Sequence, residues 1–281
     1  VRLHLEEDAG KNVHEGLPEV DRYSYIDLNR AGTPLAEIVT APDFRSSWQA
    51  YDYVNHVRRA LQWVGASEAD MEKGNLRCEA NVYVRKAGET KFNNKVELKN
   101  LNSVRFMQKA IEYEIERQIA AYEAGEEIRQ ETRLWDEKEN RTRVMRSKED
   151  AHDYRYFPDP DLQPLRVSRE FIETVERSLP ELPEQMRTRF TETYGISYSD
   201  ASQLVATRDF AEFFETAARI SANPKLAANW VLGEFTRLLN ESRRTASESL
   251  VSPEDLAELL QLVESGKINN NQAKEVFAEM F

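Results

Sequence analysis

The clearest β-strand pattern in this chain lies at residues 76–85, where the sequence reads Leu76-Arg77-Cys78-Glu79-Ala80-Asn81-Val82-Tyr83-Val84-Arg85. Apolar residues occupy every second position, which is the spacing of a strand with one buried face. The other face then carries Arg77, Glu79 and Asn81, and their side chains all point the same way. The stretch therefore predicts a half-buried strand with a polar face.

Two other segments repeat this alternation, and each adds a carboxylate to a polar strand face. At residues 96–99, Glu97 alternates with valine and leucine. In the opening strand, Glu6 lies on the polar face if Leu3 and Leu5 point inward. Three predicted strands therefore each carry one carboxylate.

These carboxylates, Glu6, Glu79 and Glu97, are the candidate catalytic and metal-binding residues. Like charges on neighbouring strands repel unless a cation lies among them, and carboxylate oxygens are ligands that suit Mg²⁺. His4 shares the face of Glu6 and is interpreted as its hydrogen-bond partner. The alternative is that exposed strand faces simply carry charge. Spacing alone leaves both interpretations open, because it does not show that the three strands are neighbours.

Helical patterns divide the chain into two parts. In the first part, apolar spacing predicts helices at residues 48–64, after Ser46 or Ser47, and at residues 104–124, after Ser103. A strand hairpin is predicted at residues 131–146. Beyond about residue 167, capped helices are predicted at residues 183–194, 198–220 and 224–239, and another begins after Ser252. This pattern indicates an α+β fold in which a sheet with covering helices precedes an all-helical part.

Composition excludes several classes of protein. The 281 residues include ten Gly, ten Pro and 10% aromatics, unlike a collagen or a disordered chain. No stretch approaches the roughly 20 apolar residues of a membrane span. A net charge of −12 is the opposite of what a nucleic-acid-coating protein needs, so nucleic-acid contacts must be local. The lone Cys78 excludes an internal disulfide, and the cytosol is the expected compartment.

Basic residues near predicted strand ends are the candidates for phosphate contact. The segment at residues 99–103 leads a strand directly into a helix N-terminus, where free N–H groups favour phosphate. Arg141, Arg143, Arg146 and Lys148 form a basic run without acidic residues. One interpretation of this run is contact with phosphate or tRNA. The other is a charged hairpin face that is balanced by nearby carboxylates.

Five motifs, in this order, resemble the B subunits of bacterial and organellar glutamyl-tRNA(Gln)/aspartyl-tRNA(Asn) amidotransferases, the GatB family. They are His4-Leu-Glu-Glu-Asp-Ala-Gly-Lys11, Asp27-Leu-Asn-Arg-Ala-Gly-Thr-Pro-Leu-Ala-Glu-Ile-Val-Thr-Ala-Pro-Asp43, Met71-Glu-Lys-Gly-Asn-Leu-Arg-Cys-Glu-Ala-Asn81, Glu97-Leu-Lys-Asn-Leu-Asn-Ser103, and Met145-Arg-Ser-Lys-Glu149 with Asp153-Tyr-Arg-Tyr-Phe157. Shorter matches at residues 228–230 and 273–274 extend the resemblance over essentially the whole chain.

The resemblance implies an ATP-dependent reaction on misacylated tRNA. In this family the B subunit turns the side-chain carboxylate of Glu-tRNA(Gln) or Asp-tRNA(Asn) into an acyl phosphate, and ammonia from the A subunit, an amidase, displaces the phosphate. The implied enzyme is a ligase that forms carbon–nitrogen bonds with glutamine as amido donor. ATP and Mg²⁺ are its implied cofactors, and the amidase, the small C subunit and the tRNA are its implied partners. We expect no membrane partner and a cytoplasmic location, in a bacterium or an organelle.

By the same resemblance, Glu6, Glu79 and Glu97 match the positions at which the family binds its catalytic Mg²⁺. Position 79 is usually aspartate in the family motif, and the longer side chain of Glu79 allows contact through water in place of direct coordination. Six further motif residues suit contact with phosphate or substrate, without individual roles: Lys11, Arg77, Asn81, Lys99, Arg146 and Lys148.

The fold implied by the family is a mostly antiparallel cradle, related to the sheets of glutamine synthetase and guanidino kinases, followed by helical domains. It implies a catalytic cradle domain at residues 1–167, a helical domain at 168–248 and the start of a tRNA-binding tail at 249–281. The family's N-terminal segment, with further metal-binding residues and in some members a cysteine zinc site, is missing from this sequence. We therefore expect a fragment, and activity only from the complete B subunit in its complex.

Two alternatives to this function remain open. One is a tRNA-binding scaffold without catalytic activity, which would have no use for a Mg²⁺ site. The other is a stand-alone ligase related to glutamine synthetase that acts on a small molecule, which would not require the helical C-terminal third.

Overall fold

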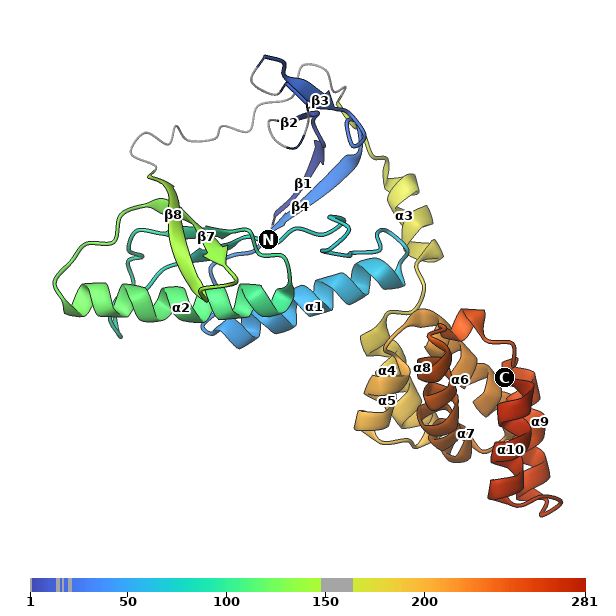
Figure 1. Ribbon diagram of the computed structural model, residues 1–281. Coiled ribbons are helices and arrows are strands. Elements are labelled where there is room, and N and C mark those ends of the chain that lie inside the picture. The colour runs from blue at the N-terminus through green and yellow to red at the C-terminus, as the bar shows by residue number, and fades with distance from the viewer. Residues whose placement is uncertain (1, 14–15, 17, 20–21, 148–163) are drawn as a thin grey trace. The chain divides into compact units, whose positions relative to one another are not determined.

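The computed structural model describes residues 2–13, 16, 18–19, 22–147 and 164–281 of the chain. It contains two compact units, Val1–Gln49 and Ala50–Phe281 (Figure 1). Lys148 and the motif at residues 153–157 lie outside the described residues, so what the sequence predicts for them stays a prediction.

The described residues of the first unit form two small antiparallel sheets. Its paired strands are β1 (Arg2–Glu7) with β4 (Pro34–Val39), and β2 (Lys11–Val13) with β3 (Tyr25–Asp27). The condition that Leu3 and Leu5 point inward is not met among the described residues, because these two side chains are 64% and 62% exposed. They do lie on the face opposite Glu6. A two-stranded sheet, however, has no second layer to bury that face within the described part of this unit.

The second unit contains a four-stranded sheet with the strand order β5-β6-β7-β8. The strands are β5 (Ala80–Val82), β6 (Val96–Lys99), β7 (Glu131–Asp136) and β8 (Arg141–Ser147). The β5–β6 and β7–β8 pairs are antiparallel, whereas β6 and β7 run parallel. The hairpin predicted at residues 131–146 is therefore confirmed.

The strand predicted at residues 76–85 is shorter than expected, because only Ala80–Val82 pairs with β6. Beyond that point the backbone hydrogen-bonds to side chains. The N–H of Val84 donates to Gln118 Oε1 at 3.1 Å, and the Val84 carbonyl accepts from Asn93 Nδ2 at 2.7 Å. These side chains take the place of a neighbouring strand, so the backbone is satisfied and the ladder ends.

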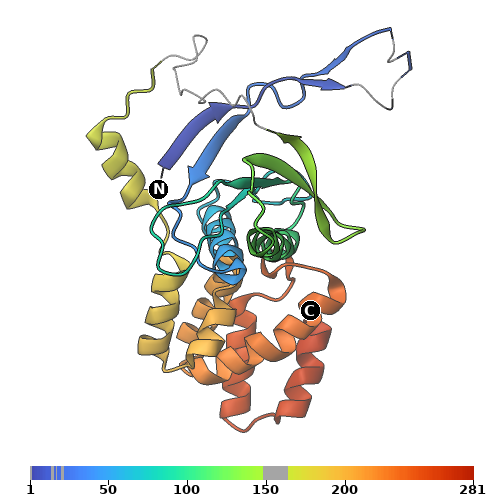
Figure 2. The same cartoon turned by 90° about the vertical axis from the view of Figure 1, so that its left-hand side faces the viewer.

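Two long helices accompany this sheet, α1 (Ser47–Trp63) and α2 (Val104–Glu123). The predicted caps are confirmed, since Ser46 accepts a hydrogen bond from the Gln49 N–H and Ser103 accepts one from the Phe106 N–H. Helix α2 lies along one face of the sheet in both views (Figures 1 and 2). The core between them includes Val82, Val96, Leu98, Met107, Ile111 and Trp135.

The described residues from 164 to 281 form helices and no strand, as predicted. The helices are α3 (Arg169–Ser178), α4 (Pro183–Tyr194), α5 (Tyr198–Leu204), α6 (Arg208–Ser221), α7 (Pro224–Trp230), α8 (Thr236–Ser242), α9 (Pro253–Glu264) and α10 (Asn270–Met280). Ser252 caps α9, as its sequence predicts. A π-helical segment (Val231–Phe235) joins α7 to α8, and a 3₁₀ turn (Ala246–Glu248) precedes α9.

The prediction of one helix at residues 198–220 is wrong, because the chain breaks between α5 and α6. Thr207 is extended there, and its hydroxyl donates to the Asp209 carboxylate, which lies in the first turn of α6. A threonine in extended conformation followed by an acidic residue begins a new helix. The helix predicted at residues 224–239 does form, and it continues through the π-helical segment to Ser242.

One buried core joins helices α4 to α10, with Phe190, Phe214, Phe235 and Phe277 at its centre. Trp63, the last residue of α1, belongs to this helical core, and its Nε1 donates to the Glu181 carbonyl at 2.8 Å. Within the second unit, α1 therefore contacts the sheet core near its start and the helical core at its end.

Trp230 is also buried in the helical core. Because α9 and α10 pack into the same core as α6 and α7, no core boundary marks residue 248. The domain limits at residues 167 and 248 stay predictions. Among the helices of the described ranges, none has the length and apolar character needed to cross a bilayer.

Candidate active site

Glu79 and Glu97 lie on the face of the four-stranded sheet that is turned away from α2. In the β5–β6 register Asn81 faces Glu97, so Glu79 falls opposite Lys99 two residues further along. The Lys99 Nζ is 2.7 Å from Glu79 Oε1 and 3.7 Å from Glu97 Oε1. The two predicted carboxylates therefore share one ammonium group as their countercharge.

A threonine from the neighbouring strand completes this group. Strand β7 runs parallel to β6 and pairs Thr132 with Glu97, and the Thr132 hydroxyl donates to Glu97 Oε2 at 2.7 Å. Thr132 is 0% exposed, and the side chain of Glu97 is 16% exposed. Thr132 was not among the predicted site residues. The alternation within residues 131–136 could have assigned its face, but not its strand partner.

The donor set of this group fits a hard divalent cation. Glu79 and Glu97 offer carboxylate oxygens, the ligands that Mg²⁺ prefers, and the Lys99 ammonium already occupies the place where positive charge is favoured. Lys99 is 32% exposed and has a flexible stem, so the ammonium can move aside. The arrangement can therefore hold a cation or a phosphate-bound metal next to a lysine.

Glu6 belongs to the first unit, where it lies beside two other polar groups. The His4 Nδ1 is 3.5 Å from Glu6 Oε1 and 3.7 Å from Glu37 Oε2, and ligand atoms of the three residues all lie within 4.8 Å of one another. The pairing of β1 with β4 places Glu37 opposite His4, a register that the sequence pattern does not supply. A single metal site that joins Glu6 with Glu79 and Glu97 stays a prediction.

The predicted phosphate-binding residues are distributed over both units. Lys11 is exposed in β2 opposite Asp27, and Arg77 and Asn81 are exposed on either side of Glu79. Arg146 lies opposite Thr132 in the β7–β8 register. Of the six residues, Lys99 is the one whose contacts with Glu79 and Glu97 are defined, and Lys148 lies outside the described residues.

The basic run in the hairpin is partly neutralised. Arg141 Nη2 lies 2.8 Å from Glu139 Oε2, and Arg143 Nε lies 2.8 Å from Asp136 Oδ2. For these two arginines the contacts favour the interpretation as a charged hairpin face.

The opposite side of the sheet holds a second, buried polar cluster around Glu114 of α2, which is 0% exposed. Arg117 Nη2 donates to Glu114 Oε1 at 2.6 Å, Gln118 Nε2 donates to the same oxygen at 2.9 Å, and Thr142 Oγ1 donates to Glu114 Oε2 at 3.2 Å. Arg133 Nε lies 3.6 Å from Glu114 Oε2. Although burial opposes its charge, Arg117 has a raised pKa because of its hydrogen bonds to Glu114. The cluster joins α2 to β7 and β8.

Cys78 precedes β5 and is half-buried, and this burial raises the pKa of its thiol to about 11. A thiol with such a pKa stays protonated at neutral pH and is a poor nucleophile. The environment of Cys78 therefore does not favour a role as a catalytic nucleophile.

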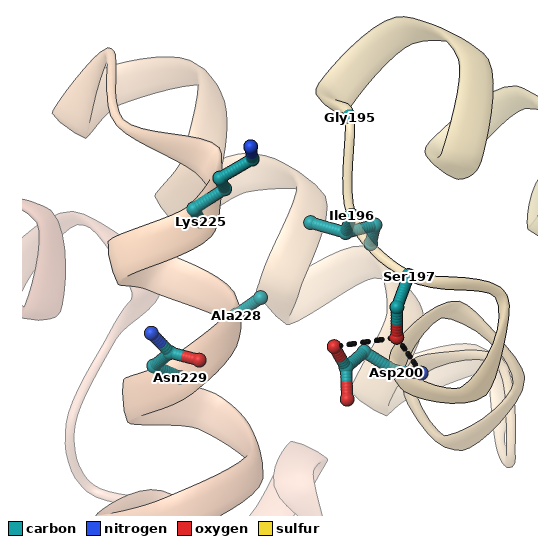
Figure 3. A pocket seen from close by; sticks show the side chains of 7 residues that line it. All are labelled: Gly195, Ile196, Ser197, Asp200, Lys225, Ala228 and Asn229. Carbon is teal, nitrogen blue, oxygen red and sulfur yellow. Dashed lines mark hydrogen bonds between the residues drawn. The ribbon is translucent and has the colours of Figure 1, made fainter.

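A pocket of about 280 Å³ lies in the helical part (Figure 3). It is lined by Gly195, Ile196, Ser197, Asp200, Lys225, Ala228 and Asn229. The carboxylate in this pocket, Asp200, stabilises the start of α5. Its Oδ2 accepts a hydrogen bond from the Ser197 hydroxyl at 2.7 Å, and Ser197 is the N-cap of α5. None of the predicted site residues lines this pocket, so the sheet face remains the candidate active site.

Comparison with known proteins gives two family matches and a series of close relatives. The family model described as "GatB/GatE catalytic domain" matches residues 1–173, and the one described as "GatB domain" matches residues 212–281. The B subunit of the aspartyl/glutamyl-tRNA(Asn/Gln) amidotransferase of Persephonella marina is 54% identical over 281 residues, and that of Thermodesulfovibrio yellowstonii is 49% identical over 280 residues. Both alignments cover 100% of this chain and 58% of the relative, so the chain spans little more than half the length of these proteins.

Proposed function

Because the chain belongs to the GatB/GatE catalytic-domain family, we propose that it is part of the B subunit of an aspartyl/glutamyl-tRNA(Asn/Gln) amidotransferase. The proposed activity is the ATP-dependent conversion of Glu-tRNA(Gln) or Asp-tRNA(Asn) into Gln-tRNA(Gln) or Asn-tRNA(Asn). It is a ligase reaction that forms a carbon–nitrogen bond, with glutamine as the source of ammonia.

The observation that carries this proposal is that Glu79, Glu97 and Lys99 lie together on the sheet face that is turned away from α2. Two carboxylates beside a lysine are what a site for magnesium and phosphate requires. A scaffold that only binds tRNA has no need for two acidic side chains at this position, since they would repel the phosphates of the RNA.

The proposed chemistry has two steps. A side-chain carboxylate oxygen of the aminoacyl group attacks the γ-phosphorus of ATP, and ADP leaves. Ammonia then attacks the carbon of the acyl phosphate, and phosphate leaves. The first step is needed because a carboxylate is a poor electrophile, and phosphorylation supplies a leaving group.

The residues of this chain have defined tasks in the proposal. Glu6, Glu79 and Glu97 would hold Mg²⁺, which when bound neutralises the charge on the transferring phosphoryl group. Lys99 would leave Glu79 and pair with a phosphate oxygen. The bound cation would then replace the Lys99 ammonium as the positive partner of Glu79. Further candidates for phosphate or substrate contact are Lys11, Arg77, Asn81, Arg146 and Lys148.

The proposed assembly follows from the family. The partners would be the A subunit, an amidase that supplies ammonia, the small C subunit, and the misacylated tRNA, and the compartment would be the cytoplasm or an organelle. Within this chain we assign the catalytic cradle to residues 1–167, a helical domain to 168–248 and the start of a tRNA-binding tail to 249–281. The relation of the cradle to glutamine synthetase and guanidino kinase sheets belongs to the same proposal.

The test uses the complete B subunit in complex with its amidase partner. Release of γ-phosphate from labelled ATP is followed with and without Glu-tRNA(Gln), in wild type and in Glu97→Ala. We expect release that requires both Mg²⁺ and Glu-tRNA and that falls by at least about 100-fold in the variant, while tRNA binding is kept. Binding of Glu-tRNA without phosphate release in wild type would establish the scaffold. Phosphate release without tRNA would favour a ligase that acts on a small molecule.

A further inference from the structure

The Thr132 hydroxyl is fixed in space by its strand and by its burial. Strand β7 is held between β6 and β8, and Thr132 is 0% exposed within it. A β-branched side chain has few accessible rotamers in a strand, so the hydroxyl direction follows the backbone. Its hydrogen bond to Glu97 Oε2, at 2.7 Å, is a short bond to a carboxylate and hence one of the stronger kinds.

The two carboxylate oxygens of Glu97 contact different groups. Oε2 receives the buried hydroxyl, whereas Oε1 is the oxygen that lies 3.7 Å from the Lys99 ammonium, on the side of Glu79. A carboxylate that is free to rotate about its last bond can present either oxygen or both. The hydrogen bond to Thr132 instead keeps Oε1 of Glu97 on the side of the Lys99 ammonium.

The polar cluster behind the sheet keeps β7 in position. The next residue, Arg133, donates to the Thr142 hydroxyl at 2.7 Å and to Glu131 at 2.8 Å, and it lies near the buried Glu114. These contacts tie β7 to β8 and to α2. The hydroxyl of Thr132 therefore projects from a rigid strand toward a carboxylate on the open face.

We propose that Thr132 is a positioning residue that orients the Glu97 carboxylate for cation binding. This inference rests on the proposed function, because it assigns Thr132 to the same carboxylate pair. The Thr132 hydroxyl holds Oε2 by its hydrogen bond, and Oε1 is then the single oxygen of Glu97 that binds the cation. Outer-sphere hydrogen bonds of this kind orient metal ligands in many proteins.

The experiment compares two buried threonines of adjacent strands in the complete B subunit with its amidase partner. Thr132→Val removes the hydroxyl beside Glu97. Thr142→Val makes the same chemical change at a residue that is 3% exposed and that donates to Glu114 on the other side of the sheet. Thr132→Ser keeps the hydroxyl. For each variant, Mg²⁺ binding without ATP is measured by titration calorimetry, and the Mg²⁺ dependence of phosphate release and the melting temperature are recorded.

We expect Thr132→Val to weaken Mg²⁺ binding by about 10-fold or more, the usual effect of losing an outer-sphere partner, and Thr132→Ser to restore it. The half-saturating Mg²⁺ concentration for phosphate release should rise by a similar factor. Thr142→Val should lower the melting temperature, and it should weaken Mg²⁺ binding far less than Thr132→Val does, because the ladders of β7 with β6 and β8 stay in place. Should Thr132→Val not fold, Thr132→Ala is measured against Thr142→Ala in the same way.

Equal Mg²⁺ affinity in wild type and Thr132→Val would overturn the inference, as would an equal loss of affinity in Thr142→Val. These results differ from failure of the proposed function. If Glu97→Gln binds Mg²⁺ as wild type does, or if the wild-type complex releases no phosphate, it is the assignment of the site itself that fails.

Discussion

On each side of the four-stranded sheet lies a glutamate with polar partners, Glu114 of α2 on one side and Glu97 of β6 on the other, and the two differ in what surrounds them. Glu114, on the side of α2, is fully buried and accepts hydrogen bonds from Arg117, Gln118 and Thr142. Glu97, on the open side, accepts from Thr132 and lies near the flexible Lys99. One carboxylate is enclosed by donors that packing holds in place, and the other faces a countercharge that can move.

This difference separates a structural carboxylate from a candidate ligand. A buried charge is tolerated when its partners are permanent, and removing one of them leaves an unpaired charge. A cation site needs the opposite, namely oxygens whose present partner can be exchanged. The type and spacing of residues do not distinguish the two cases, whereas burial and the mobility of the partner do.

The comparison is tested most strongly by Glu97→Gln in the complete complex. The substitution keeps the size of the side chain and removes its charge, so ATP-dependent phosphate release should fall by about 100-fold or more, because charge on the metal ligands supports several kcal/mol of transition-state stabilisation. The melting temperature should change little. Phosphate release near the wild-type rate would remove Glu97 from the proposed site.

Glu114→Gln tests the other side. It leaves Arg117 and Arg133 without their buried counter-ion, so the free energy of unfolding should fall by about 3–5 kcal/mol, as measured by urea denaturation. Glu112→Gln, an exposed residue on the same helix, is the control. A loss no larger than that of the control would mean that the buried cluster is dispensable.

Gln118→Leu should have a smaller effect on the same side. Gln118 is 0% exposed, donates to the Val82 carbonyl at 3.2 Å and accepts from the Val84 N–H at 3.1 Å. Leucine removes both of these hydrogen bonds and the one to Glu114, which should lower the unfolding free energy by about 1–3 kcal/mol. Hydrogen exchange at Val84 should accelerate. Unchanged exchange there would show that another group satisfies this N–H.

Lys99→Met should have the smallest effect on stability. The Lys99 side chain is 32% exposed, and ion pairs of such groups contribute about 1 kcal/mol or less. The melting temperature should therefore shift no more than in Lys73→Met, which removes the exposed pair with Glu68. A destabilisation as large as that of Glu114→Gln would make Lys99 a structural residue and erase the contrast between the two sides.

Local patterns in the sequence predicted most elements of the fold. Alternation located β6 and the β7–β8 hairpin, and the caps at Ser103 and Ser252 marked the starts of α2 and α9. These features depend on neighbours within a few residues. The break before α6 was missed because apolar residues keep helical spacing across it, from Ala201 and Leu204 to Ala211 and Phe214.

The candidate site was predictable only in part. Alternation placed Glu79 and Glu97 on polar strand faces, and the resemblance selected them from other acidic residues. The closeness of Glu97 to Thr132, and that of Glu6 to Glu37, depends on strand registers that join residues far apart in the chain. Loop lengths and tertiary packing set those registers, and no short-range pattern encodes them.

Helix α1 has a consequence for how the second unit melts. Its residues Ala50, Tyr51 and Val54 pack against the core of the sheet, and Trp63 at its other end is inserted among the helices. A segment that belongs to two cores cannot unfold with one and stay folded with the other. Heat should therefore disrupt sheet and helices of this unit together, as one cooperative transition, and shortening the Trp63 side chain should split that transition in two.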